Sequence, residues 1–136
     1  MDLQNIITFQ GLGDIRFGMR RNDIRSLLGI EYESFSRAGN DVPEIDSYDN
    51  IGLQLNYDDD DKLEFVEAIH PSNPTYDGIT FIGRKPDAVY QEMINRGVKT
   101  IQDDVGYDFP DLGFGIYVRE DTVEAVSIYR KGYYDD

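Results

Sequence analysis

The sequence predicts an α+β fold of two tandem β-α-β-β units, which form one antiparallel sheet with the helices packed on one face. Two observations lead to this prediction. Short apolar strings recur along the chain at a nearly constant spacing. One recurring pair combines a short strand, a glycine turn, a basic pair and the start of a helix, and the other combines a strand, acidic turn residues and a second strand. In addition, 136 residues with 40% hydrophobic content suit a single domain with a sizeable core.

The internal repeat rests on two pairs of segments. Residues 15–24 have a counterpart in residues 79–89, and residues 51–57 have one in residues 112–118. The starting positions differ by 64 residues in the first pair (15 to 79) and by 61 in the second (51 to 112). Two nearly equal periods predict a duplication, and the alternative is a chance recurrence of short apolar strings. The predicted copies span residues 12–70 and 77–130.

The first predicted helix follows the basic segment of the first copy. Asn22 suits the N-cap position, because its side chain can accept a hydrogen bond from a free backbone amide. Ile24, Leu27 and Leu28 lie at helical spacing and form one apolar stripe. Gly29 suits the residue that follows a helix.

The second predicted helix shows the same pattern of start, stripe and stop. Proline favours the first helical turn, so the helix is expected to begin at Pro86, with Asp87 beside its positive end. Gly97 is expected to end it. Its apolar stripe consists of Val89, Tyr90, Met93 and Ile94.

Strands are predicted where apolar and polar residues alternate. Residues 53–57 alternate as a half-buried strand does, and residues 126–129 do so less clearly. Residues 58–62 contain no apolar side chain and predict a hairpin loop, with residues 119–122 as its counterpart.

Two stretches interrupt this pattern. Residues 31–49 are polar and acidic, which predicts a long loop or an irregular edge strand. Residues 70–77 contain Pro71 and Pro74 and are expected to join the two copies.

The composition contains few of the residue types that enzymes use for catalysis. The absence of cysteine excludes disulfides, thiolate metal sites and cysteine nucleophiles. His70 is the single histidine, and a histidine before a proline at a strand end is usually a surface or capping residue. The carboxylates around Tyr107 and Phe109 could form an acid and base pair, but their neighbours offer no apolar pocket that would raise one pKa. We therefore expect no enzyme, no cofactor and no metal site.

The run Asp58, Asp59, Asp60 and Asp61 can be interpreted as a cation loop or as a solvated hairpin tip. It lacks the ligand spacing and central glycine of an EF-hand loop. Consecutive side chains in a turn also point in different directions, so few of them can converge on one ion. We expect a hairpin tip, with partner contact and weak calcium binding as the alternatives.

Charge is distributed unevenly along the chain. There are 27 acidic against 13 basic residues, and the formal net charge of -14 disfavours nucleic acid and anionic lipid as partners. The acids concentrate in residues 41–67 and 100–124, the corresponding parts of the two predicted copies, whereas residues 16–25 are basic. Tyrosines lie among these acids, as they do in protein interfaces with charged rims. Plain solubility, with the tyrosines serving as strand residues, is an equally supported interpretation.

The candidate partner-binding residues are Asp46, Tyr48, Asp49, Tyr57, Asp58, Asp59, Asp60, Asp61, Asp103, Asp104, Tyr107, Asp108 and Asp111.

One motif carries a family resemblance. The chain combines Phe17-Gly18-Met19, Asp23-Ile24 and Leu27-Leu28-Gly29, followed by Tyr48 and the predicted strand 51–57. This pattern resembles the opening strand and helix of many small bacterial proteins, including domains similar to the outer-membrane assembly lipoprotein BamE and to the tandem-repeat β-lactamase inhibitor protein. It also resembles small acidic immunity proteins encoded beside contact-dependent and other polymorphic toxins. The resemblance implies binding and neutralising a protein, often a basic nuclease toxin, and no catalytic residues carry over.

The N-terminal residues lack a basic region followed by a long apolar run, and no segment approaches the ~20 apolar residues of a membrane span. We therefore expect a cytoplasmic protein, which argues against the BamE role and against a secreted inhibitor. The first hypothesis is an immunity protein that covers the active site of a basic toxin with its acidic, tyrosine-containing surface. The alternatives are a nucleic-acid mimic with an anti-restriction or regulatory role, and a small-ligand or enzyme domain.

Overall fold

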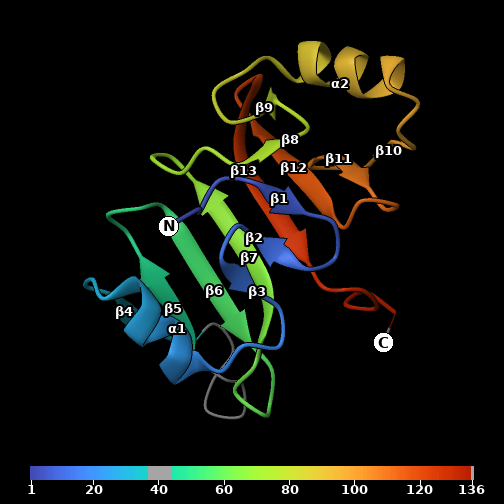
Figure 1. The fold of residues 1–136 in the computed structure, drawn as a ribbon. Coiled ribbons are helices and arrows are strands. Elements are labelled where there is room, and N and C mark those ends of the chain that lie inside the picture. Colours follow the sequence, from blue (N-terminus) through green and yellow to red (C-terminus); the bar gives the residue numbers. More distant parts are fainter. Residues whose placement is uncertain (37–43, 136) are drawn as a thin grey trace.

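The computed structural model describes residues 1–36 and 44–135, and in this part the protein has an α+β fold with a large antiparallel sheet and two helices (Figure 1). The helices are α1 (Arg21–Leu28) and α2 (Pro86–Asn95). The main sheet contains β4 (Glu33–Phe35), β5 (Ile45–Tyr48), β6 (Leu53–Tyr57), β7 (Leu63–Ile69), β10 (Ile101–Gln102), β11 (Gly106–Phe109), β12 (Phe114–Arg119) and β13 (Thr122–Tyr129). Two smaller sheets are formed by β1 (Ile6–Ile7), β2 (Gly11–Leu12) and β3 (Ile15–Arg16), and by β8 (Thr75–Tyr76) and β9 (Ile79–Thr80).

The main sheet consists of two four-stranded meanders that meet at their last strands. Its strand order is β10-β11-β12-β13-β7-β6-β5-β4, and every neighbouring pair is antiparallel. β7 and β13 join the two meanders, with Glu67 directly opposite Ser127. The edge strands β4 and β10 therefore lie at opposite ends of the sheet (Figure 1).

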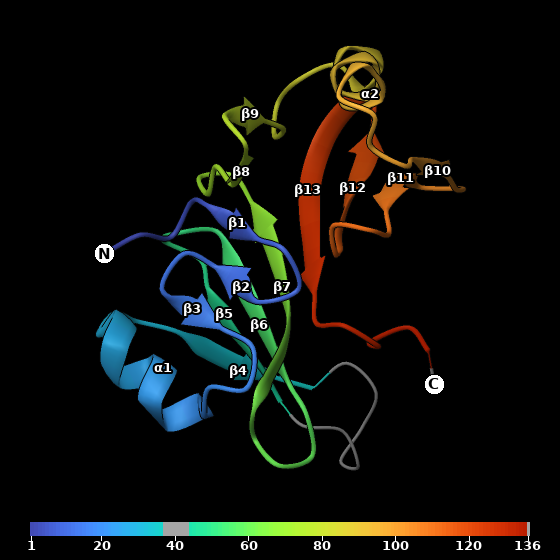
Figure 2. The ribbon, with the colours of Figure 1, turned by 45° about the vertical axis from the view of Figure 1, so that its right-hand side comes forward.

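The hydrophobic core lies on one face of this sheet. Leu55, Val66, Ile128 and Phe114 are neighbours across four adjacent strands, and all four are fully buried. Apolar side chains from both helices and from the small sheets belong to the same cluster. Figure 2 shows the meander β1–β3 and α1 on one side of β6 and β7, and the C-terminal tail on the other side. The second face of the sheet carries the alternate, more polar strand residues.

Phe114 ties the small β8–β9 hairpin to the main sheet. Its ring contacts Tyr76 on β8 and Phe81 just after β9, with centroid separations of 5.6 and 5.4 Å. It also contacts Phe109 on the neighbouring strand β11 at 5.1 Å. Offset and edge-to-face aromatic pairs at such distances stabilise a core beyond the area that they bury.

The predicted N-cap of the first helix is wrong. α1 begins at Arg21, so Asn22 lies inside the first turn, and the extended residue before the helix is Arg20, whose side chain makes no capping hydrogen bond. The backbone explains the difference, because Arg20 pairs with Lys62 and the Arg21 N–H donates to the Asp61 carbonyl at 2.9 Å. A neighbouring hairpin thus replaces the side-chain cap.

The predicted stop of the first helix and the predicted start and stop of the second are confirmed. Gly29 has φ 61°, and its N–H donates to the Arg25 carbonyl at 3.0 Å, as expected after a helix end. Pro86 is in the first turn of α2, and Gly97 has φ 76° two residues after its end. Of the predicted stripes, Ile24, Leu28, Val89 and Met93 are buried, whereas Leu27 and Ile94 are exposed.

The predicted hairpin loops are also confirmed, but the chain contains more strands than the two predicted β-α-β-β units. β6 and β7 are joined by residues 58–62, and β12 and β13 by Glu120 and Asp121, both with positive φ. Four strands of the main sheet follow each helix, and β8 and β9 lie between the two halves, so the β-α-β-β order with helices on one face is not confirmed. The stretch 31–49, predicted as a long loop or an irregular edge strand, contains β4 and β5, and its residues 37–43 lie outside the described part of the chain. The stretch 70–77, predicted to join the two copies, contains β8.

Neither helix in the described ranges is long and apolar enough to cross a membrane.

Candidate binding site on the open face of the sheet

A row of small and acidic residues crosses the sheet on the face opposite the core. Asp108 on β11 is paired with Gly115 on β12, Gly115 with Ser127 on β13, and Ser127 with Glu67 on β7. These positions alternate along their strands with the buried residues Phe109, Phe114, Ile128 and Val66, so their side chains project from the other face.

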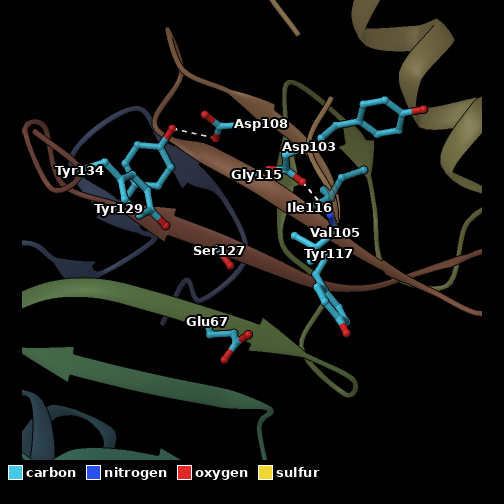
Figure 3. A pocket seen from close by; sticks show the side chains of 11 residues that line it. Glu67, Asp103, Val105, Asp108, Gly115, Ile116, Tyr117, Ser127, Tyr129 and Tyr134 are labelled. Atoms are coloured by element: carbon cyan, nitrogen blue, oxygen red, sulfur yellow. Dashed lines mark hydrogen bonds between the residues drawn. The ribbon is translucent and has the colours of Figure 1, made fainter. Parts of the chain in front are cut away.

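A hollow of about 380 Å³ lies over this row (Figure 3). Three carboxylates line it, one from β7 and two that are close in sequence, in β11 and the turn before it, together with tyrosines and the Ser127 hydroxyl. No Lys, Arg or His is among its described lining residues, which are Glu67, Asp103, Val105, Tyr107, Asp108, Gly115, Ile116, Tyr117, Ser127, Tyr129 and Tyr134. We refer to this cavity as the acidic hollow.

Gly115 keeps the floor of the acidic hollow free. A Cβ at this position would lie 3.0 Å from the Tyr107 carbonyl oxygen and 3.1 Å from Oδ1 of Asp108. Any side chain here would therefore fill the cavity and crowd the Asp108 carboxylate. The neighbouring Ser127 is also small, so β12 and β13 leave room between Asp108 on β11 and Glu67 on β7.

Asp108 is held in place by a buried hydroxyl. The Tyr129 hydroxyl donates to Oδ1 of Asp108 at 2.9 Å (Figure 3). Burial raises the pKa of the Asp108 carboxyl, the hydrogen bond from Tyr129 partly offsets this effect, and the negative charge of Asp103 raises the pKa further. Burial and the contact with Asp108 raise the pKa of Tyr129 as well, so its hydroxyl stays protonated and remains a donor.

Asp103 is fixed by the turn between β10 and β11. Its Oδ1 accepts hydrogen bonds from the backbone amides of Val105 and Gly106, at 2.9 and 2.8 Å. The Val118 amide in turn donates to the Val105 carbonyl at 2.7 Å, which attaches the turn to β12. The sequence therefore positions this carboxylate with a local Asx turn.

Aromatic rings close one end of the acidic hollow. Tyr129 contacts Tyr134 at 4.9 Å and Phe9 at 6.4 Å between ring centroids. Tyr134 in turn contacts Tyr133, whose ring packs on Phe65 of β7. The C-terminal tail is thus attached to the sheet by ring contacts, most of them edge-to-face, and forms a wall of the cavity.

Three of the predicted partner-binding residues line the acidic hollow, namely Asp103, Tyr107 and Asp108. Asp104 belongs to the same turn but is exposed outside the cavity, and Asp111 is exposed in the turn between β11 and β12. The structure therefore brings together part of the acidic segment of the second half, because β11 places Asp108 beside the turn that holds Asp103.

Asp46, Tyr48 and Tyr57 are buried, and this corrects the prediction that they contact a partner. Asp46 lies under α1, where it accepts hydrogen bonds from Arg21 and Arg25. The ring of Tyr57 lies 4.2 Å from the Arg21 guanidinium carbon, and Tyr48 is fully buried in the core. The prediction assumed that polar strand residues face solvent. In β5, however, Asp46 and Tyr48 lie opposite the buried Leu55 and Leu53 of β6 and therefore face the core.

The four consecutive aspartates form the hairpin tip, and two of them have structural roles. Oδ1 of Asp58 accepts the amides of Asp60 and Lys62, both at 2.9 Å. Oδ1 of Asp61 accepts Nε–H of Arg21 at 2.9 Å. Asp59 and Asp60 are exposed. The tip lies beyond the shared end of β6 and β7, and none of the four residues lines the acidic hollow.

A different cavity, also lined by carboxylates, lies near the other edge of the sheet. Glu31, Tyr32, Glu33, Ser47 and Asp49 are among the residues that line this cavity of about 510 Å³. Asp49 accepts a hydrogen bond from the Ser47 hydroxyl at 2.6 Å. Of the predicted partner-binding residues, Asp49 is therefore placed beside two carboxylates that the prediction omitted.

Several residues of the acidic hollow are missing from the prediction, above all Glu67, Gly115, Ser127, Tyr129 and Tyr134. The signal for two of them is present in the sequence. Glu67 and Ser127 are polar residues at alternate positions of apolar strands, which predicts that they face away from the core. The pairing of β7 with β13, however, depends on the register between the two halves of the chain.

No group of three His, Cys, Asp or Glu side chains in the described ranges is placed to hold a metal ion. His70 lies in a different cavity with Ile82, Arg119 and Glu120, away from the acidic hollow. The carboxylates of the acidic hollow are therefore spread around a cavity and do not converge on one point.

The variant Asp108→Asn is expected to be more stable than the wild type at neutral pH. A raised folded-state pKa means that Asp108 contributes stability below its ordinary pKa of 3.8, and that this contribution is lost as the pH rises through the folded-state value. Asparagine keeps an acceptor for Tyr129 and removes the charge that burial and Asp103 oppose. Urea unfolding at pH 7 and at mildly acidic pH should show a gain that shrinks as the pH falls. A loss of stability at pH 7 would mean that the charge of Asp108 supports the fold.

The chain matches no protein-family model, no curated protein and no solved structure.

Proposed function

We propose that this is an immunity-type inhibitor that acts in the cytoplasm, and that its open sheet face binds and neutralises a basic protein toxin. The observation that carries the proposal is the acidic hollow, where Glu67, Asp103 and Asp108 lie among tyrosines without a basic residue in the described lining. Tyrosine-rich contact regions with charged surroundings are typical of protein-binding surfaces.

The distribution of basic side chains supports this proposal. Arg21 and Arg25 pair with the buried Asp46 on the core face of the sheet. Arg84 pairs with Glu92 and Arg96 with Asp77, both at α2. These four cations are engaged at α1 and α2, away from the acidic hollow. A net charge of -14 then attracts a basic partner over a long range.

We also propose that the chain arose from two copies of one unit, each with a short hairpin, a helix and a four-stranded meander. Two matching backbone contacts support the duplication. Gly18 N–H donates to the Leu63 carbonyl and Leu63 N–H donates to the Met19 carbonyl, both at 2.9 Å. In the second half, Gly83 N–H donates to the Val123 carbonyl at 2.8 Å and Val123 N–H to the Arg84 carbonyl at 2.9 Å. The acidic hollow then includes Glu67 and Ser127, one of the residue pairs that join the two units across β7 and β13.

A site-directed crosslink tests the proposed function. A photoreactive amino acid replaces Tyr117, which lines the acidic hollow and is 38% exposed. The matched control carries it at Ile94, which is 41% exposed on α2. In the native host, we expect the Tyr117 position to capture one basic protein that the Ile94 position does not capture. Expression of that protein alone is expected to stop growth, and co-expression of the inhibitor to restore it.

The association rate with the captured protein gives the second readout. Electrostatic steering speeds association by about 10- to 1000-fold at low salt and is lost as the ionic strength rises. The combined variant Glu67→Gln, Asp103→Asn, Asp108→Asn should therefore associate more slowly and with a weaker salt dependence. A captured partner without excess basic residues, or an association rate indifferent to salt, would contradict the proposed function.

A further inference from the structure

The C-terminal tail, residues 130–135, lies on the open face of the sheet and does not extend it. β13 ends at Tyr129, and the chain continues in turns on the side of the sheet opposite β1–β3 (Figure 2). Tyr133 packs on Phe65 with 5.1 Å between ring centroids, and Tyr134 packs on Tyr129 with 4.9 Å. Phe65 and Tyr129 are directly opposite each other on β7 and β13, so two rings of the tail cover two rings of the sheet.

These four rings form a cluster of their own. The two rings of the tail also contact each other, with 4.9 Å between centroids and planes that are nearly perpendicular. The hydrophobic core, as the described residues form it, does not include Phe65, Tyr129, Tyr133 or Tyr134. The tail can therefore leave the sheet without opening the core.

The contacts that hold the tail are partly solvated. The Arg130 N–H donates to the Glu64 carbonyl at 3.2 Å, and the two side chains form an ion pair at 3.6 Å. The Arg130 side chain is 35% exposed, so water screens this pair. Tyr134 is 66% exposed although its ring contacts Tyr129. Because ordering a chain end costs conformational entropy at every residue, such contacts leave the docked and detached states of the tail close in free energy.

The sequence of the tail shows which chemistry this surface accepts. A cation, Arg130, is followed after two residues by the pair Tyr133 and Tyr134, and its guanidinium carbon lies 5.8 Å from the ring centroid of Tyr133. A cation near the face of an aromatic ring is attracted by the electrons of the ring. Arginine and tyrosine are also enriched among the residues that carry most of the binding energy in protein interfaces. The tail thus occupies the sheet in the way that a segment of a basic protein would.

We infer that the rings of Phe65 and Tyr129 are a docking site for a segment of the partner, and that the C-terminal tail is the internal competitor of that segment. The partner segment has the chemistry of the tail, namely a cation, two intervening residues and a pair of aromatic side chains. The inference rests on the proposed function for the source of this segment. Docking requires the tail to detach, so the tail lowers the apparent affinity in proportion to the fraction of molecules in which it is docked.

A peptide added to the full-length protein tests this competition without the partner. The probe is the capped peptide Arg-Lys-Gly-Tyr-Tyr, the sequence of residues 130–134, and amide NMR shifts report its binding. In the variant Tyr133→Ser, Tyr134→Ser, which detaches the tail, we expect saturable shifts of the Phe65 and Tyr129 amides. In the wild type, a tail docked in about nine molecules of ten lowers the affinity for the peptide about tenfold. Equal affinity of the two proteins, or no saturable shift in the variant, would overturn the inference.

Altered peptides separate the contributions of rings and charge. The peptide Arg-Lys-Gly-Ser-Ser keeps both charges and should give no saturable shift, whereas Gln-Gln-Gly-Tyr-Tyr keeps both rings and should bind more weakly than the original. Equal binding of the serine peptide would show that the negative charge of the protein alone attracts it, and would overturn the inference.

Matched variants show whether the effect belongs to the tail. Tyr117→Ser removes a ring from the same face, where Tyr117 is 38% exposed, and should bind the peptide as weakly as the wild type does. The single variant Tyr134→Ser changes a residue that is already 66% exposed, so it keeps the fold even if the double variant does not. Its affinity for the peptide should lie between those of the wild type and the double variant. An equal gain from Tyr117→Ser would contradict competition by the tail.

The captured partner separates this inference from the proposed function. If the tail competes with it, the variant Tyr133→Ser, Tyr134→Ser should bind the partner about tenfold more tightly than the wild type does. Weaker or unchanged binding of a basic partner would support the proposed function and contradict the inference. Competition between peptide and tail without any basic partner in the host would support the docking site and contradict the proposed function.

Discussion

Replacing Asp46 with asparagine is expected to lower the free energy of unfolding by about 3–5 kcal/mol, the range found when one partner of a buried ion pair is removed. The Asp46 side chain is fully buried and accepts from Arg21 Nη1 at 2.9 Å, from Arg25 Nε at 2.8 Å and from Ser34 Oγ at 2.6 Å. The neutral amide would leave two guanidinium groups under α1 without their shared counter-charge. Urea unfolding at neutral pH measures this loss.

The same carboxylate makes the fold sensitive to acid. Burial by itself disfavours the ionised form of Asp46, but hydrogen bonds from Arg25 and Ser34 and the charges of Arg21 and Arg25 outweigh it and hold the pKa below its ordinary value of 3.8. Asp46 therefore contributes stability above pH 3.8, and this contribution is lost as the pH falls through the lower, folded-state pKa. Stability of Asp46→Asn should accordingly depend less on pH in this acidic range than that of the wild type.

The exposed Asp59 provides the control for both measurements. Asp59→Asn removes the same charge from the hairpin tip and is expected to change the free energy of unfolding by less than about 0.5 kcal/mol, as surface substitutions usually do. If Asp46→Asn were equally mild, the buried ion pairs would not contribute to stability in the way that their geometry predicts.

The second large effect is expected at Gly52, which connects β5 to β6. This residue has φ 70°, and a Cβ atom there would overlap the carbonyl oxygen of Ile69 and lie 2.8 Å from the Ser72 amide nitrogen. Gly52→Ala combines left-handed backbone strain with a clash against backbone that cannot move aside. We expect a loss of more than about 4 kcal/mol, a size that points to a specific structural cause.

Gly78 offers a matched comparison for this variant. It has φ 80°, but a Cβ atom there would meet nothing within 4 Å. Gly78→Ala should therefore cost only the conformational strain, about 1–2 kcal/mol. Thermal unfolding of the two variants separates the contributions of strain and overlap, and equal losses would contradict the close approach of β7 to Gly52.

Local signals predicted the elements that depend on neighbouring residues. Gly29 and Pro86 mark helix boundaries because backbone conformation and the missing proline N–H act at a single position. The aspartate-rich hairpin was predictable for the same reason, since residues 58–62 contain no side chain that a core would bury. The prediction of Asn22 as the N-cap was wrong because the helix begins at Arg21, one residue before it. There the Arg21 N–H donates to the carbonyl of Asp61, a residue distant in the sequence.

Such signals predicted the strands between α1 and β6 only as one alternative, an irregular edge strand in place of a long loop, and β4 is an edge strand. All four residues of β5 are buried, including Asp46 and Ser47, so alternation is absent and the strand resembles a polar loop in the sequence. Asp46 is compatible with the core only because Arg21 and Arg25 of α1 reach it. The arginines that make residues 16–25 basic are thus partly core components, which composition cannot distinguish from a basic surface.

The candidate site was predicted in part for a related reason. Asp103 and Asp108 are close in sequence, and a turn is enough to bring them together. Glu67 joins them only through the pairing of β13 with β7, and Tyr134 through ring contacts of the tail. Those contacts connect parts of the chain that are far apart, so a pattern within one segment does not show them.

The shortness of β4 and β10 has a consequence for the behaviour of the protein at high concentration. These two strands end the main sheet, and they contain three and two residues. A long, flat edge strand would offer a row of backbone donors and acceptors on which another chain could build an intermolecular sheet. Within residues 1–36 and 44–135 each end offers only a few such groups, so the wide eight-stranded sheet gives little template for edge-to-edge aggregation.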